Sequence, residues 1–141
     1  MSEDLQIRLN AFFDAMERND PSVAEELVRS LCAEDCTLDA AGSEMEGTYR
    51  GHEQIVGFFR TILDGFEPLY ANRRLETYEN GILIFHYDQT MRSRATGLEL
   101  KFPACAVFTL GADGRFTSGR TVRGSADVEA TVAEVRAEAH A

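Results

Sequence analysis

The second half of the chain contains four long segments with β-strand character, at residues 69–78, 81–93, 98–110 and 116–123. Residues 79–81, 95–97 and 111–114 separate them, and each of these stretches contains glycine in a setting typical of β-hairpin turns. The spacing predicts a meander of four antiparallel strands. Such a sheet must have at least one face covered by apolar side chains from elsewhere in the chain.

The first half of the chain supplies that cover. Three segments carry apolar residues at spacings of three and four, which predicts amphipathic helices over residues 4–18, from residue 21 to about residue 31, and from residue 51 to residue 65. Asp20 as N-cap and Pro21 as first helical residue predict the start of the second helix. The apolar stripes are Leu5, Leu9, Phe12, Phe13 and Met16; Val23, Leu27, Val28 and Leu31; and Ile55, Phe58, Phe59, Ile62 and Phe66. We expect a short strand at residues 36–40 and an irregular hairpin or loop at residues 43–50.

The remaining sequence bounds the class of protein. We expect one domain over residues 1–141, with a short helix or frayed tail at residues 125–141 that either stays loose or folds over an opening. The net charge of −10, without a basic patch, argues against nucleic acid as a partner. No apolar run is long enough for a membrane span and no leader is evident, so we expect a cytoplasmic protein without membrane contact. Three cysteines, an odd number, are interpreted as reduced thiols.

Residues 81–93 alternate between two faces, as the side chains of a strand must. One face suits the wall of a pocket and consists of Leu83, Phe85, Tyr87, Gln89 and Met91. The other begins apolar and becomes polar, so we expect it to face solvent or a partner subunit; it consists of Ile82, Ile84, His86, Asp88, Thr90 and Arg92. His86 and Asp88 could act as a base with its carboxylate or as two metal ligands, but no third ligand except His52 is evident, and we expect no metal site.

The order of helix, helix, short strand, helix and long meander resembles the NTF2-like, or SnoaL-like, domains. Residues 12–20, 33–39, 49–55, 107–110 and 114–116 carry the resemblance, which covers nearly the whole chain. It implies an α+β, cystatin-like cone in which a curved antiparallel sheet wraps around three N-terminal helices and encloses a central pocket. Ketosteroid isomerases, limonene epoxide hydrolases, polyketide cyclases and binding or assembly domains share this fold.

The resemblance implies that the concave face of the sheet lines a pocket for a small hydrophobic molecule. Arg123, near the rim, would meet an anionic group. A packed core without a usable cavity is the alternative. The candidate ligand-binding residues are Phe12, Met16, Phe59, Phe85, Met91, Phe102, Ala106, Phe108, Thr121 and Arg123.

The catalytic sets of the family are not retained. Ketosteroid isomerases use a carboxylate base with a tyrosine and a protonated aspartic acid, and the resemblance places Phe12 and Ala106 at the two donor positions. Asp39 falls near the base position, but a second alignment of the following loop selects Ala40 and turns Asp39 outward. The arginine and two aspartates of the epoxide hydrolases correspond to Tyr87, Gln89 and Thr121.

Three functions remain open at this point. The first is a cofactor-independent enzyme that moves protons on a hydrophobic metabolite by isomerisation, hydration, dehydration or cyclisation, with Asp39, Tyr87 and Gln89 as catalytic candidates. The second is a binding protein with the same pocket. The third is an assembly domain. In all three cases we expect a homodimer through the outer face of the sheet.

Overall fold

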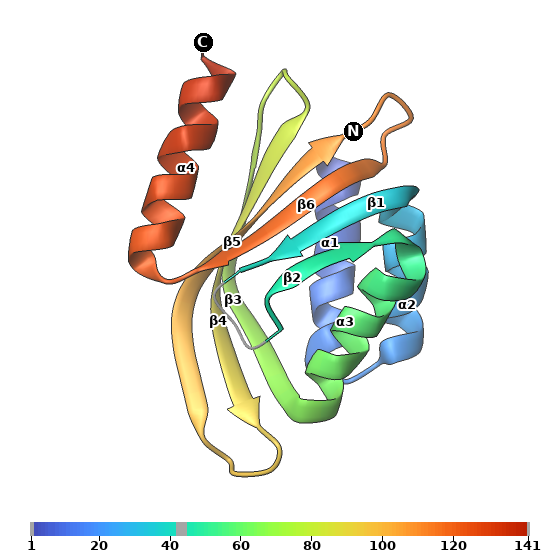
Figure 1. Ribbon diagram of the computed structural model, residues 1–141, viewed down its shortest axis with the longest axis vertical. Coiled ribbons are helices and arrows are strands. Elements are labelled where there is room, and N and C mark those ends of the chain that lie inside the picture. Colours follow the sequence, from blue (N-terminus) through green and yellow to red (C-terminus); the bar gives the residue numbers. More distant parts are fainter. Residues whose placement is uncertain (1, 42–44, 141) are drawn as a thin grey trace.

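The computed structural model describes residues 2–41 and 45–140 and consists of four helices and a six-stranded sheet within those ranges (Figure 1). The helices are α1 (Ser2–Glu17), α2 (Pro21–Leu31), α3 (Gly51–Gly65) and α4 (Ser125–Ala139). The strands are β1 (Cys32–Ala40), β2 (Gly47–Arg50), β3 (Phe66–Thr77), β4 (Ile82–Ser93), β5 (Glu99–Leu110) and β6 (Phe116–Arg123). The α+β cone predicted from the sequence is therefore confirmed, with a fourth helix added to the three at the N-terminus.

The sheet is mixed rather than wholly antiparallel. Its strand order is β2-β1-β6-β5-β4-β3, and β1 pairs with β6 in parallel while all other neighbours are antiparallel. The predicted meander corresponds to β3 through β6. Gly81 and Gly97 adopt positive φ angles of 84° and 76° in two of its turns, a conformation that glycine reaches without steric cost.

The segment before the meander differs most from expectation. The strand predicted at residues 36–40 begins four residues earlier, at Cys32, directly after α2 ends at Leu31. Of the irregular hairpin or loop predicted at residues 43–50, the hairpin alternative fits, because Gly47–Arg50 pairs with β1 in antiparallel fashion; residues 43 and 44 lie outside the described residues. Asp20 caps α2 as predicted, since its side chain accepts a hydrogen bond of 3.3 Å from the backbone N–H of Val23.

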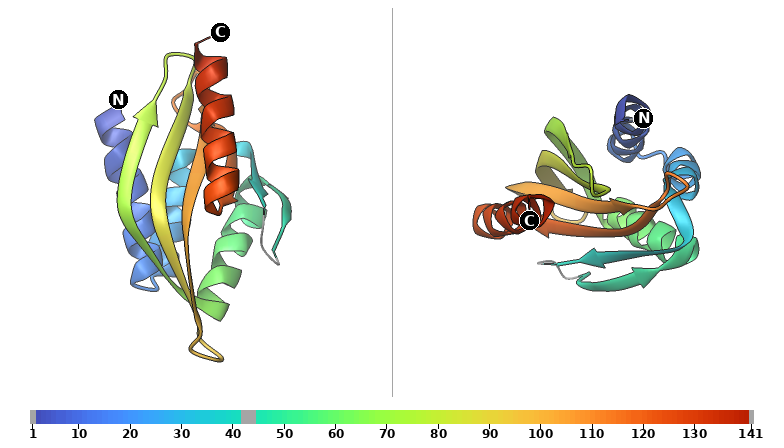
Figure 2. Two further views of the ribbon diagram at one scale, coloured as in Figure 1. Left: turned by 90° about the vertical axis from the view of Figure 1, so that its left-hand side faces the viewer. Right: turned by 90° about the horizontal axis from the view of Figure 1, so that it is seen from above.

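Helices α1, α2 and α3 lie on the concave side of the sheet and cover it with their apolar stripes (Figures 1 and 2). The alternation predicted for β4 is confirmed, because Leu83, Phe85 and Tyr87 belong to this core and Ile84 to a separate cluster on the other face. The expectation that this other face meets solvent or a partner subunit is wrong for Ile84, which packs with residues of α4. Phe13 of α1 stacks on Phe85 with ring centroids 5.1 Å apart. The main core therefore joins the first helix to the centre of the meander, far apart in sequence.

Part of the convex side of the sheet is covered by α4, which lies on the opposite side of β5 and β6 from the other helices (Figure 2). A second apolar cluster forms there from Ile84, Cys105, Val107, Val122, Val132 and Val135. The tail thus forms a helix of 15 residues that docks on the outer face, neither frayed nor folded over an opening. No helix among the described residues is long and apolar enough to cross a membrane.

Glu76 fixes α4 to the sheet. Its carboxylate accepts hydrogen bonds of 2.7 Å each from Arg136 of α4, from the Tyr78 hydroxyl and from His86. Partial burial works to raise the pKa of Glu76, but hydrogen bonds from Arg136, Tyr78, His86 and Arg74 outweigh it and lower the pKa to about 2. Burial lowers the pKa of His86 despite this carboxylate, so the imidazole is neutral at pH 7 and donates to Glu76.

We expect Glu76→Gln to lower the free energy of unfolding at neutral pH by about 2 kcal/mol, because strong hydrogen bonds to a charged acceptor are lost. The pKa of Glu76 is lowered in the folded state from an ordinary value of 4.5 to about 2, so its contribution is complete above pH 4.5 and disappears as the pH falls towards 2. Urea unfolding measured at a series of pH values should show the two proteins converging in acid. The control, Glu79→Gln in the exposed β3–β4 turn, should change stability little; a loss independent of pH would contradict the assignment.

Candidate functional site

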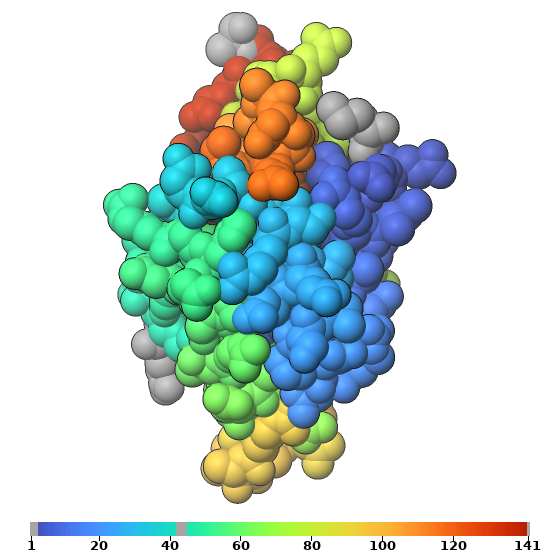
Figure 3. Space-filling view, turned by 90° about the vertical axis from the view of Figure 1, so that its right-hand side faces the viewer, coloured from blue at the N-terminus to red at the C-terminus, as the bar shows by residue number. Residues whose placement is uncertain are grey.

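A pocket of about 440 Å³ lies between the concave face of the sheet and the first three helices. This volume is typical of sites for small molecules, and it distinguishes the structure from the alternative of a fully packed core. Figure 3 views the molecule from the helix side, where α2 and α3 lie side by side in front of the sheet and the β4–β5 turn projects beyond them. Residues of that turn, Thr96 and Leu98, line one end of the pocket.

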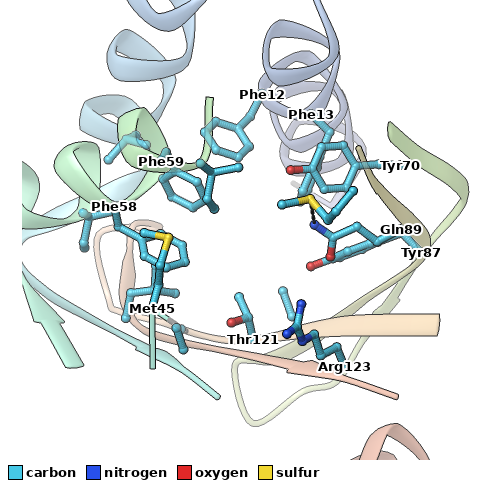
Figure 4. Close-up of a pocket in the computed structure, with 18 of the residues that line it drawn as sticks. Phe12, Phe13, Met45, Phe58, Phe59, Tyr70, Tyr87, Gln89, Thr121 and Arg123 are labelled. Carbon is cyan, nitrogen blue, oxygen red and sulfur yellow. Dashed lines mark hydrogen bonds between the residues drawn. The ribbon is translucent and has the colours of Figure 1, made fainter. Parts of the chain in front are cut away.

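The helix side of the pocket is aromatic. Phe12 of α1 meets Phe59 of α3 edge to face with centroids 4.8 Å apart, and Phe59 meets Phe58 in the same way at 5.0 Å. These rings come from the apolar stripes of α1 and α3, whose spacing brings them to one face of each helix. Together with Met45 they form a continuous apolar wall opposite the sheet (Figure 4).

The sheet side has a floor of small residues. Ala106 of β5 pairs with Thr121 of β6, which pairs in turn with Ala40 of β1, so the three side chains form one row on the concave face. In the next row stands Gly119, where a Cβ atom would come within 3.0 Å of the Phe108 ring. The small side chains of the first row leave part of the volume that the pocket occupies, whereas the missing side chain at Gly119 makes room for the Phe108 ring.

Polar groups gather at one side of this floor. Tyr70 of β3, Tyr87 and Gln89 of β4, and Arg123 of β6 extend into the cavity (Figure 4). Tyr70 and Gln89 are direct cross-strand partners, and Ala104 stands between Tyr87 and Arg123. The Gln89 amide donates a hydrogen bond of 3.1 Å to the sulfur of Met91. The register of four strands thus places hydrogen-bonding groups side by side in an otherwise apolar space.

Burial makes the two phenols, which are protonated at neutral pH in any case, still harder to ionise. It raises the pKa of Tyr70, with the nearby Tyr87 and Glu17 contributing, and it raises the pKa of Tyr87 as well. Within residues 2–41 and 45–140, neither phenol oxygen forms a hydrogen bond to another side chain or to the backbone. Both O–H groups are therefore placed to donate to an oxygen of a bound molecule.

A charged network behind the pocket holds Tyr70 in position. The backbone N–H of Tyr70 donates to Glu17 at 2.7 Å, and its carbonyl accepts from Arg73 at 2.9 Å. Arg73 also reaches Asp14 and Glu17 at 2.7 and 3.3 Å, which ties β3 to α1. A register shift in β3 between residues 71 and 74 makes this possible, because it turns Arg73 back towards the helix.

Asp39 does not belong to the pocket, which corrects its prediction as a catalytic base. It lies exposed on the other face of β1 and accepts a hydrogen bond of 2.5 Å from the Thr48 hydroxyl. Ala40 lines the pocket instead, so the second of the two alignments considered from the sequence holds. The physical reason is the alternation along β1: Ala40 pairs with the inward Thr121, and Asp39 with the outward Arg120.

The other sequence-predicted residues divide into two groups. Tyr87 and Gln89 line the pocket together with seven of the ligand-binding candidates, which are Phe12, Phe59, Met91, Ala106, Phe108, Thr121 and Arg123. Three candidates do not line it. Met16 and Phe85 are fully buried in the core, and the Phe102 ring lies under the Arg123 guanidinium at 4.8 Å.

The prediction that His86 and Asp88 lie on the face of β4 that points away from the pocket is confirmed. His86 contacts Glu76, and Asp88 accepts a hydrogen bond of 2.8 Å from Asn72. His52 lies elsewhere, with its ring nitrogen 2.8 Å from the carbonyl oxygen of Cys32. Across the described part of the chain, no three histidine, cysteine, aspartate or glutamate side chains are grouped to hold a metal ion.

Sequence reasoning missed several lining residues. Tyr70 is the most important of them. The alternation along β3 could have identified it, since Pro68 and Tyr70 lie two residues apart on the same face and are both buried. Cys32 and Cys36 also line the pocket, next to each other through a thiol hydrogen bond that lowers the pKa of Cys36 although burial opposes it. Their proximity depends on the irregular start of β1, which has no signature in the sequence.

Comparisons with known proteins agree with this geometry. The sequence profile of the SnoaL-like domain family matches residues 9–119. No curated protein is significantly similar in sequence. Similar solved structures include a protein with a ketosteroid isomerase-like fold from Catenulispora acidiphila, in complex with trimethylamine, at TM-score 0.67 and 14% identity over 86% of this chain and 88% of that one.

Two further structures extend the likeness. An NTF2-like protein from Burkholderia xenovorans has TM-score 0.69 and 20% identity over 92% of this chain and 95% of its own. The epoxide hydrolase/cyclase-like enzyme SalBIII, which acts in pyran ring formation in the polyether salinomycin, has TM-score 0.69 and 17% identity over 89% and 95%. At these identities the likeness shows the fold alone.

We expect Arg73→Ala to lower the free energy of unfolding by about 2–4 kcal/mol, because it leaves Asp14 and Glu17 without their shared, mostly buried partner. Exchange of the Tyr70 amide proton, measured by NMR, should accelerate as α1 separates from β3. Arg18→Ala is the matched control, since Arg18 is exposed and makes one ion pair of 3.8 Å, and it should cost less than about 1 kcal/mol. Equal effects of the two variants would show that the network does not position Tyr70.

Proposed function

This chain belongs to the family of SnoaL-like domains, and we propose that its pocket binds a small, mostly hydrophobic molecule that carries a hydrogen-bond-accepting oxygen. One observation carries the proposal. Two protonated phenols, Tyr70 and Tyr87, and the Gln89 amide stand side by side on one wall of a cavity that is otherwise lined by aromatic and aliphatic groups. A ligand with one polar end satisfies both parts of such a site.

The apolar wall supplies affinity and the polar groups supply orientation. Burial of a ligand between Phe12, Phe58 and Phe59 is favoured by roughly 25 cal/mol for each Å² of apolar surface removed from water. A hydrogen bond from a phenol to a ligand oxygen adds a smaller net gain in binding free energy. Burial of the same oxygen without a donor would lower the affinity, because its hydrogen bonds to water would be lost. The pocket therefore selects molecules whose oxygen meets the Tyr70 and Tyr87 side.

A second candidate is catalysis without a cofactor at the same site, favoured by the position of the two phenol groups on the wall of the pocket. Protonated phenols polarise a carbonyl or epoxide oxygen and stabilise the negative charge that develops there. Among the described lining residues there is no carboxylate or imidazole to remove a proton. The chemistry that fits best is ring closure, in which the attacking group belongs to the substrate itself and the enzyme activates the oxygen.

Binding is tested with two probes of similar shape, 2-acetylnaphthalene and 2-ethylnaphthalene, which differ in the acceptor oxygen. The ketone should bind more tightly, and Tyr87→Phe should weaken its binding about twofold to tenfold while leaving the hydrocarbon unchanged, as expected for one neutral hydrogen bond. Ligand fluorescence measures both affinities. Ala106→Leu, which fills the floor of the pocket, should weaken binding of both probes.

Tyr78→Phe is the matched control, because Tyr78 bonds Glu76 on the convex side, away from the pocket. It should change neither affinity. If neither probe binds, or if Ala106→Leu leaves both affinities intact, the pocket is not the binding site. A ketone and a hydrocarbon that bind equally would remove the role assigned to the phenols.

We also propose that the chain forms a homodimer through the part of the outer sheet face that α4 leaves uncovered. Leu69 is 53% exposed there and pairs across the sheet with Thr90, whose other neighbour is Lys101. An exposed leucine on a sheet face is stabilised when a second subunit covers it. Sedimentation should give a dimer at micromolar concentration, and Leu69→Lys should shift it to monomer. A wild-type monomer under these conditions would contradict the proposal.

A further inference from the structure

Arg123 gives the pocket one charged end. Among the lining residues in the described part of the chain it alone carries a full charge at neutral pH; the others are apolar or neutral. Arg123 is the last residue of β6 and is half-buried, and Thr121 precedes it on the same concave face. The side chain of Arg123 extends towards the cavity, beside Thr121 (Figure 4).

The register of the sheet leaves space in front of this guanidinium. Ala104 is the cross-strand partner of both Arg123 and Tyr87, so a methyl group is the only side chain between a cation and a phenol. Neighbouring strands are about 4.8 Å apart, so the two backbones that carry these groups are separated by roughly 10 Å. This gap suits a small polar group that both residues contact.

The contact between Arg123 and Phe102 is compatible with the binding of a small polar group by the guanidinium. The guanidinium carbon lies 4.8 Å from the centroid of the Phe102 ring, an arrangement in which the flat face of the cation meets the ring. The five N–H donors of a guanidinium lie at its edges, so stacking orients them without consuming them. Two parallel donors can then bind a carboxylate while others keep further contacts.

We propose that the ligand of this pocket is a hydrophobic carboxylic acid, bound with its carboxylate at Arg123, Thr121 and Tyr87 and its hydrocarbon part between Phe12, Phe58 and Phe59. This inference rests on the proposed binding function and specifies the chemical class of the ligand. A single cation matches a head group with a single negative charge. A phosphate monoester, which carries close to two charges at neutral pH, would lack a second cation.

The net negative charge of the protein does not prevent the binding of a carboxylate inside the pocket. The net charge of −10 repels anions at a distance, but physiological salt screens such repulsion beyond about 8 Å. Within the pocket, the described lining residues include the Arg123 cation and no carboxylate. We therefore expect the preference for acids to survive at moderate salt.

The test uses a matched pair of probes, 1-naphthaleneacetic acid and its neutral amide, titrated calorimetrically into the full chain at neutral pH. The acid should bind at least about tenfold more tightly than the amide, as expected for a charge-assisted hydrogen bond. Arg123→Gln should remove this preference while leaving the affinity for the amide within about twofold, and Arg123→Lys should retain part of it. Arg120→Gln, on the opposite face of the same strand, should preserve it.

The outcomes separate this inference from the proposed function. If acid and amide bind equally, or if 1-naphthyl phosphate binds more tightly than the acid, the assignment to carboxylic acids fails although the pocket still binds hydrophobic molecules. If Arg123→Gln weakens both probes equally with an unchanged melting temperature, Arg123 shapes the pocket and does not recognise charge. If neither naphthalene probe nor 2-acetylnaphthalene binds, the binding function itself is wrong.

Discussion

The structure depends on the need to cover both faces of one curved sheet. On the convex side, the 15 residues of α4 pack directly on the strands through a cluster of aliphatic side chains. On the concave side, three helices cover the sheet through large aromatic side chains, while the facing strands present Ala40, Ala106 and Gly119. Where these small strand residues face the aromatic rings of the helices, space remains between the two layers, and the pocket occupies it.

The polar groups of the pocket are held by partners outside it. Glu17 and Arg73 fix the backbone of Tyr70, and the Phe102 ring orients the Arg123 guanidinium. Such support matters because a donor contributes to binding or catalysis only when its position is settled before the ligand arrives. Burial of the Arg73 charge is energetically costly, but this residue lies behind the site, where ion pairs with Asp14 and Glu17 compensate for the cost. The described residues that line the cavity itself supply mostly neutral hydrogen-bond donors.

Membership of the SnoaL-like family describes a scaffold more than a reaction. No carboxylate lies among the described residues that line this pocket, whose polar side chains include two tyrosines, a glutamine and an arginine. The same cone can bind, orient or activate a molecule according to the few side chains that reach its interior. For this chain we propose that those side chains recognise an oxygen-bearing hydrophobic molecule, and that ring closure is the reaction which donors alone would promote.

The sequence by itself determined the features that depend on local periodicity. Alternation along residues 81–93 placed Tyr87 and Gln89 inside and His86 and Asp88 outside, and helical spacing identified the stripes that face the sheet. Tertiary structure decided what depends on pairing between distant segments. The parallel register of β1 with β6 chose Ala40 over Asp39, the irregularity in β3 brought Arg73 to α1 behind Tyr70, and α4 docked on the convex face. These outcomes could not be read from the sequence, because a shift of one residue in a strand reverses its faces while leaving the local pattern unchanged.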